Sequence, residues 1–305
     1  MPTTDGDEVR DAGEAQDAAH RAGGGVPVVR DPSELRQTSE RIRASRLSLG
    51  LVPTMGALHA GHRSLIQRAR VECERVVVSI FVNPTQFGPN EDYDRYPRSL
   101  EADLALCAAE GVDHVYAPSV EAMYPAAFAT RVRVTGSLTE TLEGAWRPGH
   151  LEGVATVVAK LLVTARPDRA YFGQKDAQQC AVVRRLACDL DTGTEIVVCE
   201  TVRDPDGLAL SSRNAYLDAE ARRQALAIPA ALAVARTLYR DGERDADRLI
   251  QAAIRRLAES PNLSVDYLAA VDAETLQAVQ SVDDRCEILI AARIGGTRLI
   301  DSMRP

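Results

Sequence analysis

The strongest constraint on the fold is a nearly uninterrupted apolar run over positions 76–82, Val-Val-Val-Ser-Ile-Phe-Val. A strand that is buried on both faces lacks the alternation of apolar and polar side chains found in half-exposed strands. The run therefore predicts a parallel strand inside a sheet that helices cover on both sides. Further strands are predicted at 49–52, 112–117, 169–172 and 195–198, and helices at 62–72, 99–110, 153–165 and 176–190. This alternation predicts an α/β fold with a doubly wound parallel sheet and right-handed crossovers.

The pattern changes after about residue 202. Two helices are predicted first, and three short strands follow them, which is typical of a small α+β domain. We therefore expect a first domain over 26–201 and a smaller C-terminal domain over 202–305. The C-terminal elements are predicted at 218–240 and 245–259 for the helices and at 265–271, 286–291 and 297–301 for the strands.

The first 25 residues contain Asp, Glu, Ala and Gly but no Leu, Ile, Phe, Tyr or Trp. Such a segment cannot bury enough apolar surface to offset its ordering entropy. It is predicted to be a disordered acidic tail.

Composition excludes several classes of function. The net charge of −8 argues against a general nucleic-acid binder, which needs a basic face. No segment approaches the roughly 18 consecutive apolar residues of a membrane span, so no membrane partner is expected. The six cysteines form no CxxC pair and no metal-ligand spacing, which favours reduced thiols in a cytoplasmic protein.

One loop between a predicted strand and a predicted helix carries two histidines. The segment 53–62 reads Pro-Thr-Met-Gly-Ala-Leu-His-Ala-Gly-His, with His59 and His62 about one helical turn apart. The free N–H groups and the positive dipole end of the helix that follows make a site for phosphate. Both imidazoles can donate hydrogen bonds to phosphate oxygens. Two alternatives remain. The histidines could be a pair of metal ligands, although no third ligand follows at a spacing typical of metal sites, or they could be two solvated loop residues.

Two other loops follow predicted strands, where ligands bind in open α/β sheets. The amides of Asn83 and Gln86 can read substrate hydroxyls or a carboxylate, although Asn-Pro also initiates plain turns. Lys175 lies in the segment Gly173–Asp176. It is one of only two lysines among 36 Lys and Arg residues, which favours a phosphate contact over a solvated surface position.

A fourth segment, Leu210–Asn214, places two serine hydroxyls and an arginine near the predicted domain boundary. This composition suits a mobile phosphate clamp, with a Ser-rich helix cap as the alternative. A fifth, Arg147-Pro148-Gly149-His150, is by itself only a loop.

Taken in order, these motifs resemble one family, pantothenate synthetase (pantoate–β-alanine ligase). The resemblance covers residues 27 to 303 and implies a Rossmann-like nucleotidyl-transferase domain with a C-terminal lid domain. It also implies a cytosolic, Mg²⁺-dependent homodimer that uses ATP to join pantoate to β-alanine through pantoyl adenylate, releasing AMP and pyrophosphate. The motifs are 53–62, Phe81–Phe87, Tyr96–Arg98, Arg147–His150, Gly173–Gln179 and Ser211–Leu217.

The resemblance assigns roles position by position. His62 is implied as the proton-donating catalytic group, and His59, Lys175 and Arg213 as its catalytic partners. Pantoate binding is implied for Gln86 and Gln179, with β-alanine also at Gln86, and Asn83 is the third substrate-binding candidate. ATP binding is implied for Met55, His59, His62, Gly173, Lys175, Asp176, Val202, Leu210, Ser211, Ser212 and Arg213.

The chain departs from the family pattern at Gln174, Ala177, Leu210, Trp146 and Leu151. None of these changes removes a group assigned to the chemistry, although Trp146 is expected to narrow the mouth of the site. Two alternatives stay open at this point. One is a nucleotidyl transferase that acts on a different acid, and the other is a catalytically silent nucleotide-binding protein.

Overall fold

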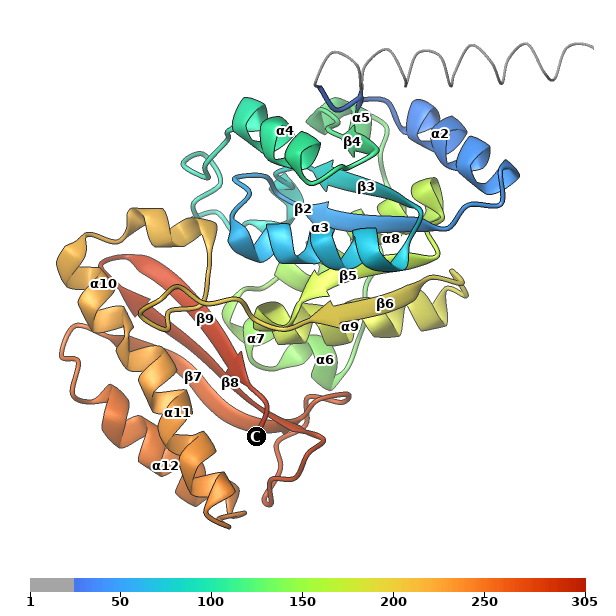
Figure 1. Cartoon of the computed structure of the whole chain (residues 1–305). Helices are drawn as coiled ribbons and strands as arrows, with labels where there is room; N and C mark the ends of the chain where they lie inside the picture. The colour runs from blue at the N-terminus through green and yellow to red at the C-terminus, as the bar shows by residue number, and fades with distance from the viewer. Residues whose placement is uncertain (1–24) are drawn as a thin grey trace, which may run out of the picture.

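The computed structural model describes residues 25–305 of the chain, so the predicted tail lies outside the described residues but for Gly25. The larger unit is built on a six-stranded parallel sheet in the order β1-β4-β3-β2-β5-β6 (Figure 1). The predicted doubly wound sheet is therefore confirmed. The strands are β1 (Val28–Val29), β2 (Leu49–Thr54), β3 (Arg75–Ile80), β4 (His114–Tyr116), β5 (Arg169–Gly173) and β6 (Glu195–Cys199).

Helices cover both faces of this sheet. Strand β3 shows why its sequence lacks alternation, because Val77 packs in one apolar core and Val76 and Val78 pack in the other. The core with Val76 and Val78 is completed by α3 (Ala60–Glu72) and α4 (Leu100–Ala109). The opposite core is completed by α2 (Pro32–Ala44), α8 (His150–Ala165) and α9 (Ala177–Asp189).

Helix α2 was not predicted, although its start carries a local signal. The Asp31 carboxylate accepts a hydrogen bond from the Ser33 N–H at 2.7 Å, and Pro32 occupies the first helical turn. An N-cap aspartate followed by proline is a typical helix start. The other unpredicted helices are too short to show periodicity: α5 (Val120–Met123), α6 (Ser137–Glu140), α7 (Glu143–Trp146) and the 3₁₀ helices η1 (Pro84–Gln86), η2 (Gln174–Asp176) and η3 (Ser212–Tyr216).

The order of strands places a topological switch point between β2 and β5. Strand β2 pairs with β3 on one side and with β5 on the other, and the chain winds away from β2 and β5 in opposite directions. Ligands bind at such a point, beyond the carboxyl ends of the strands. The loops that follow β2, β3, β5 and β6 all lie at this end, as the sequence predicted for the first three.

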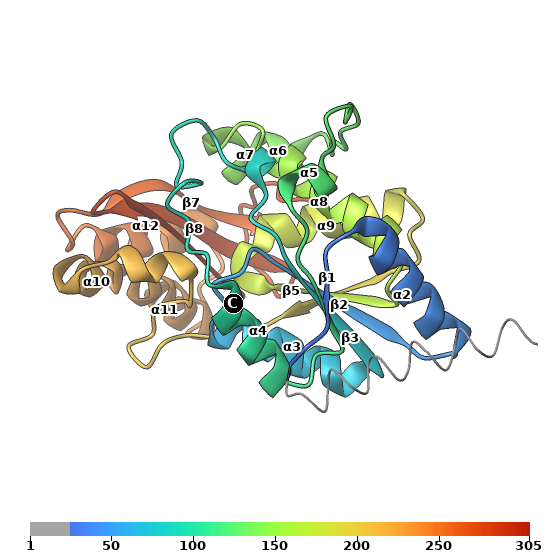
Figure 2. The ribbon, with the colours of Figure 1, turned by 90° about the horizontal axis from the view of Figure 1, so that it is seen from above.

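The smaller unit is an antiparallel sheet in the order β7-β8-β9, with three helices over one face (Figure 2). The prediction of one helix over 218–240 is wrong, because the helix breaks at Leu226. Pro229 has no N–H to donate to the carbonyl of Ala225, which ends the first helix there. The elements are α10 (Ala219–Ala225), α11 (Ala227–Arg240), α12 (Ala246–Leu257), β7 (Ser264–Asp272), β8 (Cys286–Ile294) and β9 (Thr297–Met303).

The two units meet at the carboxyl ends of the parallel strands. Ser302 Oγ in β9 donates to the carbonyl of Gln174 at 3.1 Å. Arg298, also in β9, donates two hydrogen bonds, of 2.8 and 2.6 Å, to the carboxylate of Glu143. The C-terminal sheet is thereby bonded to η2, which follows β5, and to α7. The domain boundary at 201–202 stays a prediction.

Two further observations concern the described chain. Over residues 25–305, no helix is long and apolar enough to cross a bilayer. All six cysteines are free thiols, and Cys73, Cys107, Cys180 and Cys286 are buried.

Candidate functional site

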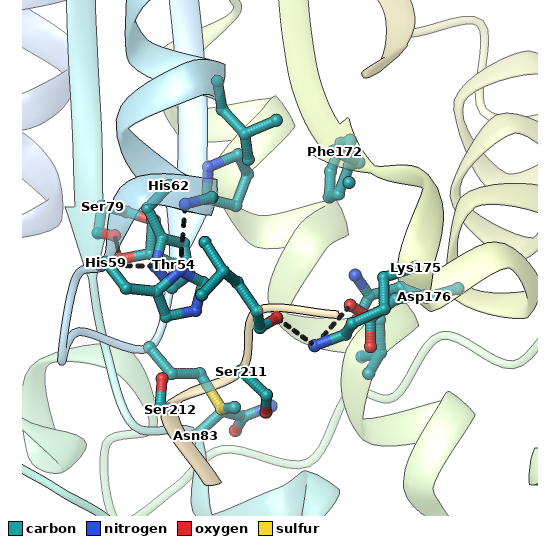
Figure 3. A pocket seen from close by; sticks show the side chains of 18 of the residues that line it. Thr54, His59, His62, Ser79, Asn83, Phe172, Lys175, Asp176, Ser211 and Ser212 are labelled. Carbon is teal, nitrogen blue, oxygen red and sulfur yellow. Dashed lines mark hydrogen bonds and ion pairs between the residues drawn. The ribbon is translucent and has the colours of Figure 1, made fainter. Parts of the chain in front are cut away.

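The strand-end loops enclose a cavity of about 200 Å³ at the switch point. Figure 3 shows His59 and His62 on one side of it and Lys175 with Asp176 on the other. Every residue that the sequence singled out for substrates or chemistry lines this single cavity: Met55, His59, His62, Asn83, Gln86, Gly173, Lys175, Asp176, Gln179, Val202, Leu210, Ser211, Ser212 and Arg213.

The loop between β2 and α3 is held by a carboxylate that the sequence analysis missed. Gly56 and Ala57 both adopt positive φ, at 82° and 49°. The buried Asp103 of α4 accepts hydrogen bonds from the N–H groups of Ala57 (2.9 Å) and Leu58 (2.8 Å). The sequence signal for this role is an acidic residue on the apolar face of α4. Buried carboxylates are rare unless they are paired, so such a residue indicates a bonding partner elsewhere in the fold.

The two histidines cap α3 with their own side chains. His59 Nδ1 accepts from the N–H of Gly61 at 3.1 Å, and His62 Nδ1 accepts from the N–H of His59 at 3.3 Å. With both Nδ1 atoms acting as acceptors, the ring protons reside on the Nε2 atoms. Gly61 permits this arrangement, since a Cβ there would lie 2.9 Å from His59 Cε1. One of the helix N–H groups expected to face phosphate is therefore bonded to an imidazole.

Burial makes both imidazoles neutral donors. It lowers the pKa of His59 to about 4, and the positive charge of Lys175 adds to the effect. Burial, followed by electrostatic interactions with His59 and Lys175, holds the pKa of His62 well below its usual range. At neutral pH, the cationic groups at this cavity are accordingly Lys175 and Arg213, and the histidines contribute N–H dipoles.

Lys175 is only loosely bonded within the protein. Its Nζ lies 3.5 Å from the carbonyl oxygen of Leu210 and 3.6 Å from Asp176 Oδ2. The lysine side chain is 19 % exposed and that of Asp176 is 40 % exposed. The ammonium can therefore redirect toward an anion in the cavity at little cost.

Arg213, in contrast, already has a counter-ion. Its Nε and Nη2 donate to the two oxygens of Asp92 at 2.9 and 2.8 Å, and its guanidinium lies 5.6 Å from the centre of the Tyr96 ring. The neighbouring Ser211 accepts from the N–H of Arg213 at 3.3 Å and caps η3. Ser212 Oγ lies 3.3 Å from the carbonyl oxygen of Ala57. Ser211 therefore caps a helix, and Ser211, Ser212 and Arg213 also line the cavity.

Gln86 presents its amide to the cavity from a fixed support. Its Oε1 accepts from Asn83 Nδ2 at 3.0 Å, and its Nε2 lies 3.1 Å from Met55 Sδ. Asn83 Oδ1 accepts in turn from the N–H of Thr85 and from the Tyr124 hydroxyl. The bonds of Asn83 thus go to protein groups, and Gln86 and Gln179 are the amides left to contact a substrate.

A metal would have to be held largely by a ligand in this cavity. Residues 25–305 contain no cluster of three or more His, Cys, Asp or Glu side chains placed to hold an ion. Mg²⁺ commonly binds through one or two carboxylates together with substrate phosphates. Asp176 and Glu200 line the cavity and fit that requirement.

Comparison with known proteins identifies the family. The family model for pantoate-beta-alanine ligase matches residues 27–304. The chain belongs to the pantoate–β-alanine ligase family. The pantothenate synthetase of Thermotoga petrophila is 50 % identical over 277 residues, which is 91 % of this chain and 99 % of the relative.

Solved structures of this ligase family support the same assignment. Pantothenate synthetase from Thermus thermophilus is 48 % identical, with a TM-score of 0.87 over 92 % of this chain and 99 % of that one. The Francisella tularensis pantoate-beta-alanine ligase, complexed with beta-gamma ATP and beta-alanine, is 34 % identical, with a TM-score of 0.75 over 92 % and 97 % of the two chains.

Two departures of this ligase from the family motifs, Gln174 and Ala177, have local explanations. Gln174 Nε2 donates to the buried carboxylate of Glu287, whose pKa is raised by burial. A glutamate at position 174 would face that carboxylate as a second negative charge. Ala177 packs against Leu289 of β8. Trp146 was expected to narrow the site; it is 48 % exposed, and the described residues that line the cavity do not include it.

Proposed function

We propose that this ligase joins pantoate to β-alanine in two steps that share the cavity. A carboxylate oxygen of pantoate attacks the α-phosphorus of ATP, and the bond to the β-phosphate breaks with loss of pyrophosphate. The amine of β-alanine then attacks the acyl carbon of pantoyl adenylate. The bond to AMP breaks, the amine loses a proton, and pantothenate and AMP leave.

The observation that carries the proposal is the convergence of neutral N–H donors, a loosely held ammonium and the side-chain amides of Gln86 and Gln179 on one cavity. Bringing a carboxylate to a phosphate concentrates negative charge, which preorganised donors and cations stabilise. No residue needs to act as a nucleophile. Catalysis then comes from alignment and from charge stabilisation.

The roles follow from the bonding state of each group. The Nε2–H groups of His59 and His62 donate hydrogen bonds to phosphate oxygens. Because burial keeps His62 neutral, the proton-donor role that the family resemblance implies for it is proposed to be hydrogen-bond donation. Lys175 turns from its long contacts to the phosphates, and Arg213, held by Asp92, contacts ATP from the side of the C-terminal unit. ATP further contacts Met55, Gly173, Asp176, Val202, Leu210, Ser211 and Ser212.

Substrate recognition falls to two amides. Gln86 and Gln179 bind the hydroxyl and carboxylate oxygens of pantoate, and Gln86 also contacts β-alanine. Asn83 supports this site by holding the Gln86 side chain at 3.0 Å. Neutral amides suit a hydroxy acid, whereas a phosphorylated substrate would require more cations at that end of the cavity.

Mg²⁺ is the proposed cofactor, with Asp176 as its protein carboxylate alongside Glu200. When it is bound with ATP, it neutralises phosphate charge. The protein's own part is to orient the phosphates toward the histidines and Lys175.

We further propose that the ligase acts as a cytoplasmic homodimer. Six free thiols suit a reducing compartment. Light scattering on the purified chain tests the dimer, with twice 33.0 kDa as the expected mass.

The activity is tested by measuring AMP release from ATP with each substrate omitted in turn. We expect AMP only when both pantoate and β-alanine are present, and ATP–pyrophosphate exchange with pantoate alone. Exchange supported by a different acid, and not by pantoate, would favour a related nucleotidyl transferase. No exchange with any acid, despite ATP binding, would indicate a silent nucleotide-binding protein.

A further inference from the structure

Behind the Gln86 amide lies a charged cluster that has no assigned part in the reaction. Arg147 donates to both oxygens of Glu91, at 2.7 Å from Nε and 2.6 Å from Nη2. Its side chain is only 11 % exposed. A bidentate ion pair of this kind fixes the plane of the guanidinium as well as its position.

The arginine then determines which nitrogen of His150 carries the proton. Arg147 Nη1 lies 2.9 Å from His150 Nε2. A guanidinium can only donate, so Nε2 accepts and the ring proton resides on Nδ1. Nδ1 lies 2.8 Å from the backbone oxygen of Gln86, to which it donates. Burial, together with the charge of Arg147, lowers the pKa of His150 to about 4 and keeps the ring neutral.

The first turn of helix α8, which begins at His150, also packs against the segment that carries Gln86. A Cβ on Gly153 would lie 2.4 Å from the backbone oxygen of Thr85, so only glycine permits this approach. The carbonyl of Gly153 accepts from Asn83 Nδ2 at 3.1 Å, and the same Nδ2 donates to Gln86 Oε1. The first turn of α8 thus fixes Gln86 at two points, its backbone through His150 and its side chain through Asn83.

We propose that Arg147 and His150 are positioning residues that set the Gln86 amide for pantoate. This inference rests on the proposed role of Gln86. A displacement of about 1 Å in a substrate-positioning group can lower the rate by two orders of magnitude. Within the described residues, the side-chain hydrogen bonds of Arg147 and His150 go to Glu91, Glu143, the Gln86 backbone and each other. Losing these bonds is therefore expected to act on pantoate and not on ATP.

Two substitutions at position 150 separate the two hydrogen bonds. His150→Asn can keep a donor near the place of Nδ1, whereas His150→Gln places its amide near Nε2 and loses the bond to Gln86. We expect His150→Gln to raise KM for pantoate at least tenfold with KM for ATP within twofold. His150→Asn is expected to stay within about threefold of the wild type in both constants. Val163→Ala, at an exposed position of the same helix, is the control.

A second variant keeps the test valid if His150→Gln does not fold. Arg147→Lys retains the positive charge opposite Glu91 but loses the bidentate hydrogen bonding of the guanidinium. We expect this variant to raise KM for pantoate about threefold. Thermal melts identify the folded variants. Equal changes in KM for pantoate and for ATP in either variant, or no change in KM for pantoate, would overturn the proposal.

A double-substitution cycle separates this inference from the role of Gln86 itself. We expect Gln86→Ala to raise KM for pantoate and His150→Gln to add nothing further in that background. A full additional effect there would show that His150 acts independently of Gln86. If Gln86→Ala leaves KM for pantoate unchanged, the proposed substrate role of Gln86 fails, and the positioning role fails with it.

Discussion

Replacing Lys175 with methionine separates the electrostatic role of this residue from any structural one. Methionine keeps much of the apolar length of the side chain and removes the ammonium. Within residues 25–305 the ammonium lies 3.5 Å from a carbonyl oxygen and 3.6 Å from the Asp176 carboxylate. A loose pair of this kind contributes about 0 to 1 kcal/mol to the free energy of unfolding. The melting temperature is therefore expected to fall by less than about 4 °C.

The effect on the reaction is expected to be much larger. A preorganised group that stabilises charge in a water-excluded site typically contributes about 10²- to 10³-fold to the rate. We expect Lys175→Met to lower the rate of pantoate-dependent ATP–pyrophosphate exchange by that factor. The pKa of His59 should rise at the same time, because the charge of Lys175 contributes to lowering it.

Exchange of ³²P-labelled pyrophosphate into ATP at saturating pantoate measures the first step alone. Differential scanning calorimetry on the same samples measures stability. An exchange rate within about threefold of the wild type, in a protein that is fully folded, would refute the assigned role of Lys175. A large loss of stability with a proportionate loss of exchange would show that the lysine is structural.

Three further outcomes are expected. Gly61→Ala places a Cβ 2.9 Å from the His59 ring, so the ring must move and exchange should fall at least tenfold. The free energy of unfolding in urea should change by less than about 1 kcal/mol, because the helix propensity of alanine offsets the weakened cap from His59. Glu143→Gln should cost about 2 kcal/mol in urea unfolding, because it removes the charge of one of the two buried carboxylates bonded to Arg298, the other being that of Asp266, whereas the exposed Arg223→Gln should leave the midpoint unchanged. The free energy of unfolding should fall as the pH drops from 6.5 toward 4, because the unfolded chain protonates His59 before the folded chain does; His59→Asn should show a smaller fall between pH 7 and pH 5.

The parallel sheet was predictable because its signals are local. The apolar run at β3 requires burial on both faces, and the helical spacing after His62 identifies α3 without any knowledge of tertiary contacts. The break at Leu226 is not evident from the sequence although Pro229 is visible, because the apolar spacing of a helix continues through the position where Pro229 removes one backbone donor.

The site was predictable as a set of residues but not in its electrostatics. Strand-end position and residue type singled out the two histidines, Lys175 and Gln86, whereas Gln179 came from the family resemblance. The neutral state of the histidines depends on burial between loops, and the bond between Arg213 and Asp92 joins residues 121 positions apart. Asp103 and Glu287 also bond to residues that are distant in the sequence. Local sequence patterns do not reveal such contacts.

An isotope-transfer experiment tests the central claim, that the cavity aligns the pantoate carboxylate with the α-phosphate of ATP. Pantoate labelled with ¹⁸O in its carboxylate is turned over with ATP and β-alanine, and the products are examined by ³¹P NMR. We predict one ¹⁸O atom in the phosphate of AMP and none in pyrophosphate. Unlabelled AMP, or label in inorganic phosphate or pyrophosphate, would contradict the account.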